Sequence, residues 1–213
     1  MLNTAFILAA GLGSRMRPLT AHCAKPLLHF RGERLIERHL HRLSAAGFQH
    51  VIINCSWQSQ LLRQVLGDGK RYGISILYSC EDSTPLETAS GIARATDLLQ
   101  ENAFLLINGD IWTDLDLGKI RLCANCPHIV LVDNPPHNPA GDFALIGEKV
   151  QNSGDTTLTY AGVGIINSQL VQGSASTGAK LGDSLRMAAK QSRLTGLHHQ
   201  GEWYDVGTPA ALV

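Results

Sequence analysis

Short apolar runs alternate along the first two-thirds of the chain with segments in which apolar residues recur at helical spacing. Within 34–46, for example, Ile36, Leu40 and Leu43 fall on one face, and Gly47 is placed to end the helix. Further helices are predicted at 61–66, 88–99 and 180–190. The apolar runs predict strands at 4–9, 51–54, 74–78, 104–107 and 129–132.

Strands that alternate with helices imply βαβ units, with helices on both faces of a sheet. The runs are continuously apolar, as expected for strands whose two faces are both covered. From residue 133 the rhythm changes to a proline-rich loop and short runs at 143–146, 158–160, 163–166 and 194–198. We therefore expect an α/β fold: a Rossmann-like three-layer sandwich with a mostly parallel central sheet and a small antiparallel subsheet. Residues 1–213 are expected to form a single domain with two halves, 1–132 and 133–213.

Composition narrows the possible functions. The 213 residues are 44% hydrophobic and 17% charged, and 18 basic residues balance 18 acidic ones. This balance argues against a protein that coats nucleic acid or a membrane surface. No apolar run approaches the roughly 20 residues that cross a bilayer, and residues 5–10 lack the basic flank of a signal peptide. We expect a cytoplasmic protein without nucleic-acid or membrane partners.

Five cysteines at scattered positions are typical of reduced thiols rather than of a disulfide framework. Cys123 and Cys126 form a CxxC pair, for which a zinc or redox site is the alternative interpretation. A zinc site needs two further ligands, and only His128 lies nearby in the sequence. We therefore expect no metal or redox role for this pair.

A glycine-rich turn follows the first strand directly. Residues 11–20 read GLGSRMRPLT, and Lys25-Pro26 follows. Glycines at the carboxyl end of a strand let backbone N–H groups approach phosphate oxygens, and Arg15 and Lys25 can neutralise phosphate charge. A dinucleotide-binding GxGxxG is excluded because Met16 stands at its third glycine, and no Walker A sequence is present. The alternative is an ordinary tight turn with solvated arginines.

Two aspartates are candidates for a metal site. Asp110 follows an apolar strand, so its carboxylate should emerge at the ligand-binding edge of the sheet. Asp205 lies far away in sequence, two residues before Gly207. Two carboxylates together with phosphate oxygens suit Mg²⁺, which takes few protein ligands. The alternative is that Asp110 caps a helix and Asp205 lies in a turn.

The glycine-rich turn with Lys25-Pro26, the sequence Asn-Gly-Asp at 108–110 and the sequence WYDVGTP at 203–209 together resemble the signature of the sugar-1-phosphate nucleotidyltransferases. The resemblance covers essentially the whole chain and implies the nucleotide-diphospho-sugar transferase fold. Four further segments resemble the N-acetylmuramate-1-phosphate uridylyltransferase branch of that family: 85–88, 108–114, 131–135 and 141–143. The resemblance thus implies an enzyme that joins UTP and a sugar 1-phosphate, recycles cell-wall sugars and releases pyrophosphate.

The resemblance also implies roles for individual residues. Arg15, Lys25 and Asp110 would be catalytic, and Asp110 and Asp205 would hold Mg²⁺. The half 1–132 would bind the nucleotide through Ala10, Gly11, Leu12, Gly13, Lys25, Glu81, Thr88 and Asn108. The half 133–213 would bind the sugar phosphate through Asp142, Tyr160, Gly162 and Lys180.

Two departures from the family pattern leave the substrate open. Glu87 stands where many relatives have a base-contacting glycine, and the usual Glu-Lys-Pro before the sequence AGVG at 161–164 is missing, so that Lys180 is the candidate replacement for its lysine. A guanylyl- or cytidylyltransferase for mannose 1-phosphate or phosphocholine is one alternative. A non-catalytic sensor of nucleotide sugars is another, which the intact Arg15, Lys25, Asp110 and Asp205 disfavour. No sequence feature indicates an oligomeric state.

Overall fold

Four parallel strands form one half of the central sheet. The computed structural model describes residues 2–81, 86–99, 101–120, 127–175 and 178–212. The strands β1 (Thr4–Leu8), β4 (His50–Cys55), β5 (Ser75–Cys80) and β6 (Ala103–Asn108) are parallel and lie in the order β5-β4-β1-β6. Their carboxyl ends, which carry Leu8, Asn54, Cys80 and Asn108, meet at one edge of the sheet.

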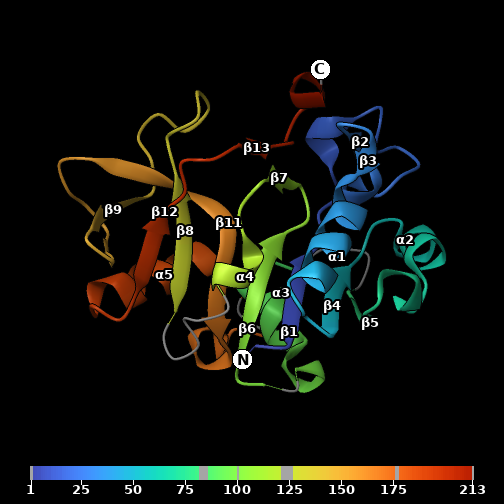
Figure 1. Cartoon of the computed structure of the whole chain (residues 1–213), viewed down its shortest axis with the longest axis horizontal. Helices are drawn as coiled ribbons and strands as arrows, with labels where there is room; N and C mark the ends of the chain where they lie inside the picture. Colours follow the sequence, from blue (N-terminus) through green and yellow to red (C-terminus); the bar gives the residue numbers. More distant parts are fainter. Residues whose placement is uncertain (1, 82–85, 100, 121–126, 176–177, 213) are drawn as a thin grey trace.

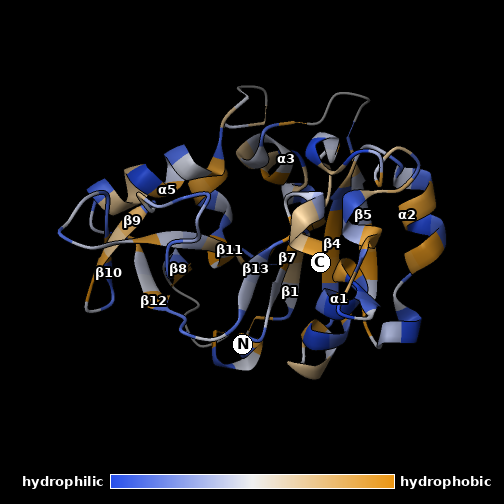
Figure 2. Ribbon diagram, turned by 90° about the horizontal axis from the view of Figure 1, so that it is seen from above, coloured by the Kyte–Doolittle hydropathy of each residue, from blue (hydrophilic) through white to orange (hydrophobic). Residues whose placement is uncertain are grey.

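Helices cover both faces of these strands (Figure 2). On one face, α1 (Leu35–Ala45) and α2 (Ser59–Leu66) share a buried apolar cluster with Ile7 and Ile53. On the other face, α3 (Thr88–Arg94) and α5 (Leu181–Lys190) belong to a second buried apolar cluster that includes Phe6 and Ile52, the residues next to Ile7 and Ile53 in the sequence. Because adjacent residues of a strand point to opposite faces, a continuously apolar strand serves both clusters. The predicted α/β class is confirmed, with helices on both faces of the parallel strands.

The prediction of a mostly parallel sheet is wrong. Beyond β6 the sheet continues as β11 (Thr157–Asn167), β8 (His128–Val132), β12 (Thr195–His198), β10 (Lys149–Gln151) and β9 (Phe143–Ile146). Among these strands only β8 and β12 run parallel, and β9 pairs with both β10 and β11, which closes five strands into a barrel. Short connections such as the turn between β9 and β10 produce antiparallel pairs, whereas parallel pairs need crossovers of about a dozen residues or more.

The long strand β11 joins the two halves of the sheet, because it pairs with β6 as well as with β8 (Figure 1). Two separate strands were expected at 158–160 and 163–166. The structure instead has one strand with an irregular register between Tyr160 and Gly164, where Gly162 has φ +73°. The helix expected at 88–99 is also divided: α3 ends at Arg94, and a 3-10 helix follows at Thr96–Leu98.

Several short elements were not expected from the sequence. The helix α4 covers Leu117–Ile120, and the hairpin strands β2 and β3 cover His29–Phe30 and Glu33–Arg34. More important for the site, β7 (Ile111–Thr113) pairs antiparallel with β13 (Trp203–Asp205). Further 3-10 helices cover Ser14–Met16, Lys25–Leu27, Lys70–Tyr72, Ser168–Val171 and Pro209–Leu212.

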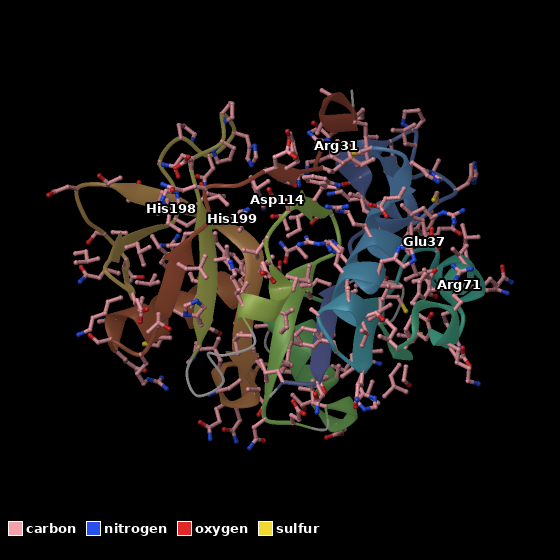
Figure 3. All side chains as sticks on the ribbon, viewed as in Figure 1. Arg31, Glu37, Arg71, Asp114, His198 and His199 are labelled. Atoms are coloured by element: carbon pink, nitrogen blue, oxygen red, sulfur yellow. The ribbon has the colours of Figure 1, made fainter. Side chains whose placement is uncertain are left out.

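Residues 199–202, which lead to β13, contact two residues of the N-terminal half, Arg31 and Asp114. Figure 3 labels these two residues and His199. The Arg31 guanidinium donates hydrogen bonds of 2.9 and 3.0 Å to the carboxylate of Glu202. His199 Nε2 lies 2.8 Å from the Asp114 carboxylate. These contacts fix the path of β13 across the end of the sheet.

No helix within the described residues combines the length and apolar character that a bilayer-spanning segment requires. The cysteines Cys23, Cys55 and Cys80 are free thiols, as the sequence predicts. The CxxC pair Cys123 and Cys126 lies outside the described residues, and so does Pro85.

Candidate functional site

Two adjoining cavities open at the carboxyl ends of the parallel strands. The first, called the Gly11 cavity, has a volume of about 380 Å³. Its described lining residues are Leu8, Ala10, Gly11, Asn54, Leu86, Thr88, Asn108, Asp110, Tyr160, Leu181 and Gly182. Because open α/β sheets bind ligands at this edge, the Gly11 cavity is where the sequence predicts a phosphate-bearing ligand.

The two glycines of the turn after β1 are required for different reasons. A Cβ at Gly11 would meet no protein atom within 4 Å, so this glycine leaves open space in the cavity. Gly13 has φ +62°, and a Cβ there would lie 2.9 Å from Thr20 Cγ2. The Thr20 hydroxyl donates a 2.7 Å hydrogen bond to the Gly13 carbonyl, which closes the turn. Gly13 therefore shapes the turn, whereas Gly11 gives a ligand access to its backbone.

Asn54 holds together three strand ends at the back of the Gly11 cavity. Its Oδ1 accepts a 2.8 Å hydrogen bond from the Ala9 N–H, directly after β1. Its Nδ2 donates a 2.8 Å hydrogen bond to the Glu81 carboxylate, directly after β5. The other Glu81 carboxylate oxygen accepts a 2.7 Å bond from the N–H of Leu86, which lines the cavity. The buried Glu81 side chain is 8% exposed, and its hydrogen bonds position Asn54 and Leu86, which line the cavity.

The second cavity, called the Asp205 cavity, has a volume of about 360 Å³. Its described lining residues are Arg15, Asn108, Asp110, Ile111, His137, Asn138, Asp142, Thr159, Tyr160, Ala161, Gly162, Trp203 and Asp205. Asn108, Asp110 and Tyr160 line both cavities. A ligand in the Gly11 cavity and a second ligand in the Asp205 cavity would therefore meet at these three side chains.

The short β7–β13 pair brings Asp110 and Asp205 to the same cavity. Asp205 is the register partner of Ile111, and the next N–H, of Val206, donates a 3.0 Å hydrogen bond to the Asp110 carbonyl. Lys25 is 8% exposed, and its Nζ lies 2.5 Å from Asp110 Oδ2. A Cβ at Gly207 would lie 3.1 Å from the Asp205 carboxylate, so a glycine there keeps the carboxylate free of crowding.

The electrostatics of the pair fit a cation. Burial and the negative charge of Asp110 raise the pKa of the Asp205 carboxyl, and Lys25, His137 and Arg15 oppose that rise. Two carboxylates that line one cavity and repel each other are costly to ionise together unless a cation lies near them. Within the described residues, His, Cys, Asp and Glu form no cluster of three or more that could hold a metal. Asp110 and Asp205 suit Mg²⁺, which takes one or two protein carboxylates and completes its shell with ligand phosphates and water.

The barrel side of the Asp205 cavity is polar. Asp142 Oδ2 accepts a 2.9 Å hydrogen bond from the Tyr160 N–H, which fixes one carboxylate oxygen. The Tyr160 hydroxyl is buried without a hydrogen-bond partner in the described structure, and burial raises its pKa. A Cβ at Gly162 would lie 2.7 Å from Asn108 Nδ2, so glycine is required where β11 passes Asn108.

The structure brings most residues singled out from the sequence to these cavities. Ala10, Gly11, Thr88 and Asn108 line the first, and Arg15, Asp142, Gly162 and Asp205 line the second. Five others are not among the described lining residues of either cavity: Leu12, Gly13, Lys25, Glu81 and Lys180. Lys25 instead reaches the site through its contact with Asp110. Lys180 precedes α5, and its neighbours Leu181 and Gly182 line the Gly11 cavity rather than the Asp205 cavity.

Sequence reasoning missed several lining residues. Asn54 ends an apolar strand just as Asn108 does, so the same strand-end signal was available for it. His137 and Asn138 lie in the proline-rich loop after β8, and His137 Nε2 lies 3.4 Å from Asp205 Oδ2. No local signal separates these loop residues from solvated ones. Two larger cavities have volumes of about 810 Å³ each: one lies between α2 and β5, and the other lies beside Arg31 and shares His137, Trp203 and Asp205 with the Asp205 cavity.

Comparisons with known proteins point to one family. A protein-family profile described as "Nucleotidyl transferase" matches residues 4–146. An N-acetylmuramate alpha-1-phosphate uridylyltransferase from Neisseria meningitidis serogroup B is 44% identical over 98% of this chain and 94% of its own. A protein of the same name from Caulobacter vibrioides is 28% identical over 97% of this chain and 93% of its own.

The fold is similar to solved structures whose sequences have diverged. A UTP-bound UGPase from Acinetobacter baumannii matches with a TM-score of 0.81 at 15% identity, over 100% of this chain and 91% of that one. The family profile covers more than half of the chain, and the Neisseria protein matches nearly all of it. This chain belongs to the nucleotidyl transferase family.

Proposed function

We propose that this protein transfers a uridylyl group from UTP to N-acetylmuramate 1-phosphate in the presence of Mg²⁺ and releases pyrophosphate. The observation that carries the proposal is the pair of cavities that meet at Asn108, Asp110 and Tyr160. One cavity begins at a glycine-rich turn suited to a phosphate chain, and the other combines a cationic side chain with polar groups suited to a sugar phosphate. The nearly full-length similarity to the Neisseria uridylyltransferase supports the choice of substrates.

In this proposal residues 1–132 and 133–213 form the two halves of a single domain. The first half supplies most of the nucleotide cavity and the second most of the sugar-phosphate cavity, and each cavity also has lining residues from the other half. UTP occupies the Gly11 cavity, with its phosphates near the backbone of Ala10 and Gly11 and its uridine toward Leu86 and Thr88. N-acetylmuramate 1-phosphate occupies the Asp205 cavity, where the second oxygen of Asp142 and the backbone near Gly162 are available to its hydroxyl groups.

The reaction forms a bond between an oxygen of the sugar phosphate and the α-phosphorus of UTP, and it breaks the bond from that phosphorus to the pyrophosphate. The attacking phosphate is already ionised at neutral pH, so no general base is required. The protein must align two anions that repel each other and must stabilise the charge that moves onto the pyrophosphate. In this proposal Arg15, which lines the Asp205 cavity, and Lys25, which contacts Asp110, would oppose this charge. Asp110 and Asp205 would hold Mg²⁺, which neutralises phosphate charge when bound.

The test is pyrophosphate release from purified protein with Mg²⁺ and each nucleoside triphosphate in turn. Each nucleotide is paired with N-acetylmuramate 1-phosphate, glucose 1-phosphate and mannose 1-phosphate at equal concentrations. We expect UTP with N-acetylmuramate 1-phosphate to have the highest kcat/KM. Single-group contacts discriminate by about 1–3 kcal/mol, so slower use of other sugars is compatible with the proposal. A preference for GTP with mannose 1-phosphate would refute it and favour a guanylyltransferase.

A further inference from the structure

Cys55 and Cys80 form a close thiol pair on neighbouring strands. Cys55 ends β4 and Cys80 ends β5, and the two residues are register partners in the parallel pairing. Their sulfur atoms lie 3.4 Å apart. Adjacent strands are about 4.7–4.9 Å apart, which falls within the Cα separation of about 4.4–6.8 Å that disulfides span. The two thiols therefore need only a small approach to reach the bonding distance of about 2.05 Å.

The two thiols differ in their access to solvent. Cys80 is exposed, whereas Cys55 is fully buried. Burial and the hydrogen bond with Cys80 raise the pKa of the Cys55 thiol to about 12. An external reagent therefore meets Cys80 first, and Cys55 is placed to react with whatever forms there.

The pair lies beside residues that shape the Gly11 cavity. Asn54 precedes Cys55 and lines this cavity, and Glu81 follows Cys80 and holds the Leu86 N–H. The Glu81 N–H donates a 2.7 Å hydrogen bond to the Cys55 carbonyl. Asn54 and Glu81 are also joined directly by a 2.8 Å hydrogen bond. A change in the distance between the ends of β4 and β5 should therefore shift both Asn54 and Leu86, which line the cavity.

We propose that Cys55 and Cys80 are a reversible modification site: they form an intramolecular disulfide that weakens the binding of nucleoside triphosphate in the Gly11 cavity. The coupling to the nucleotide rests on the proposed function, whereas formation of the disulfide does not. The oxidant is a low-molecular-weight disulfide such as oxidised glutathione.

The chemistry balances in two exchange steps. Cys80 loses its proton to solvent, and its thiolate attacks one sulfur of the small disulfide, which releases one small thiolate and leaves a mixed disulfide on Cys80. The Cys80 thiol that contributes to the raised pKa of Cys55 is then gone. Cys55 loses its proton to the small thiolate released in the first step, and its own thiolate attacks the Cys80 sulfur and displaces the second small thiolate. Two protein thiols are oxidised to one disulfide, and one small disulfide is reduced to two thiols after these thiolates take up protons.

The experiment uses the full chain with Cys123 and Cys126 both changed to serine, which removes the CxxC pair as a source of disulfides. The protein is treated with oxidised glutathione, and its peptides are mapped by mass spectrometry without reduction. We expect a Cys55–Cys80 cross-linked peptide that dithiothreitol removes. Cys80→Ser in the same background is the matched control, because this exposed substitution leaves the buried Cys55 in place. A map without the cross-linked peptide would overturn the modification site.

UTP binding is then measured by calorimetry with the oxidised and the reduced protein. We expect about tenfold weaker binding after oxidation, full recovery with dithiothreitol, and no effect of the oxidant on Cys80→Ser. Tenfold corresponds to 1.4 kcal/mol, close to the contribution of one hydrogen bond. A cross-linked protein whose UTP affinity changes less than twofold would overturn the coupling. Reduced protein that binds no nucleoside triphosphate would overturn both the coupling and the proposed function, while the peptide map alone decides whether the disulfide forms.

Discussion

At the scale of single residues, the charges around Asp110 decide what the site can bind. Lys25 lies 2.5 Å from one oxygen of Asp110, and Asp205 faces the same cavity with a raised pKa. Three carboxylates, those of Asp110, Asp142 and Asp205, line this cavity, against the two permanent positive charges of Lys25 and Arg15. This imbalance is suited to a divalent cation that brings phosphate oxygens with it.

The two carboxylates should both be required for turnover. We predict that Asp110→Asn and Asp205→Asn each lower kcat by more than about a hundredfold, roughly 3 kcal/mol, because each loses a charged metal ligand without losing volume. The measurement is steady-state pyrophosphate release over a Mg²⁺ titration. Asp116→Asn is the control, because Asp116 is an exposed carboxylate outside both cavities. A variant with a normal rate at limiting Mg²⁺ would remove that residue from the metal site.

The cations should act on the chemical step. We predict that Lys25→Ala and Arg15→Ala lower kcat more than they raise the KM for the sugar phosphate, since their charges oppose negative charge that shifts during the reaction. Losing one well-placed group of this kind typically costs about 2.7–4 kcal/mol. Full kinetics for both substrates measure the split, with the exposed Lys119→Ala as control. An increase in KM alone would instead assign the residue to binding of the sugar phosphate.

Buried His39 should make the fold sensitive to acid. His39 lies on α1 behind Asp110, and burial together with Arg42 and Arg38 lowers its pKa from 6.5 to about 4. Below pH 6.5 the unfolded chain takes up a proton at this histidine and the folded chain does not, so the free energy of unfolding falls between pH 6.5 and about 4. The full loss for this group is roughly 3 kcal/mol, and it vanishes above pH 7.

Urea unfolding of the wild type and of His39→Gln at pH 7.5, 6 and 5 measures this effect. The variant should lose less stability than the wild type as the pH falls. His41→Gln, at an exposed position of the same helix, should follow the wild type. Equal pH dependence in all three proteins would show that His39 takes up its proton normally in the folded state.

At the scale of elements, the two glycines of the turn between β1 and the 3-10 helix at Ser14–Met16 have different roles. Gly13 is needed for the conformation of the turn, and Gly11 leaves room for a ligand. Gly11→Ala places a methyl group in open space, so we predict a change in stability within about 0.5 kcal/mol but a raised KM for UTP. Gly13→Ala forces a positive φ on alanine and a contact with Thr20, so we predict destabilisation of at least about 1 kcal/mol. Thermal unfolding and UTP kinetics of the two variants decide. Equal losses of stability in the two variants would mean that Gly11, like Gly13, is needed for the conformation of the turn rather than for ligand access.

The conformation of β11 depends both on its local sequence and on the strands that it pairs with. Its apolar residues predict strand, but the irregular register around Gly162 arises because β11 must pair with β6, β8 and β9 in turn. One element thereby supplies Tyr160 and Gly162 to the cavities while it joins the barrel to the parallel strands. The register of such a strand depends on partners that lie far away in sequence.

At the scale of the whole molecule, a ligand held between the two halves should stabilise the fold. A ligand at a hundred times its Kd adds about 2.7 kcal/mol to the free energy of unfolding. For a chain of this size we predict that UTP with Mg²⁺ raises the Tm by about 5–10 °C. EDTA should abolish most of this rise, and Asp205→Asn should show little of it. An equal rise with UTP in EDTA would indicate that nucleotide binding does not use the metal.

Much of the fold follows from the sequence because its signals are local. Continuous apolar runs predict β1, β4 and β6, and helical spacing predicts α1 and α5, since both patterns depend on residues a few positions apart. The glycine-rich turn and the strand-end position of Asp110 are local signals as well. These local signals are sufficient to predict the edge of the sheet at which most of the candidate residues lie.

Tertiary structure alone decided which distant segments meet. The β7–β13 pair that sets Asp205 beside Asp110 is only three residues long, too short to stand out in the sequence. Closure of the barrel through β9 and β11, the burial of Glu81 behind the cavity, and the contact of Cys55 with Cys80 likewise depend on strand order and register. Local sequence predicts the main helices and strands and the chemistry available at their ends, because both depend on neighbouring residues. The order and register of strands that are distant in sequence decide which of those groups share a cavity, because strand order and register depend on the packing of the whole molecule.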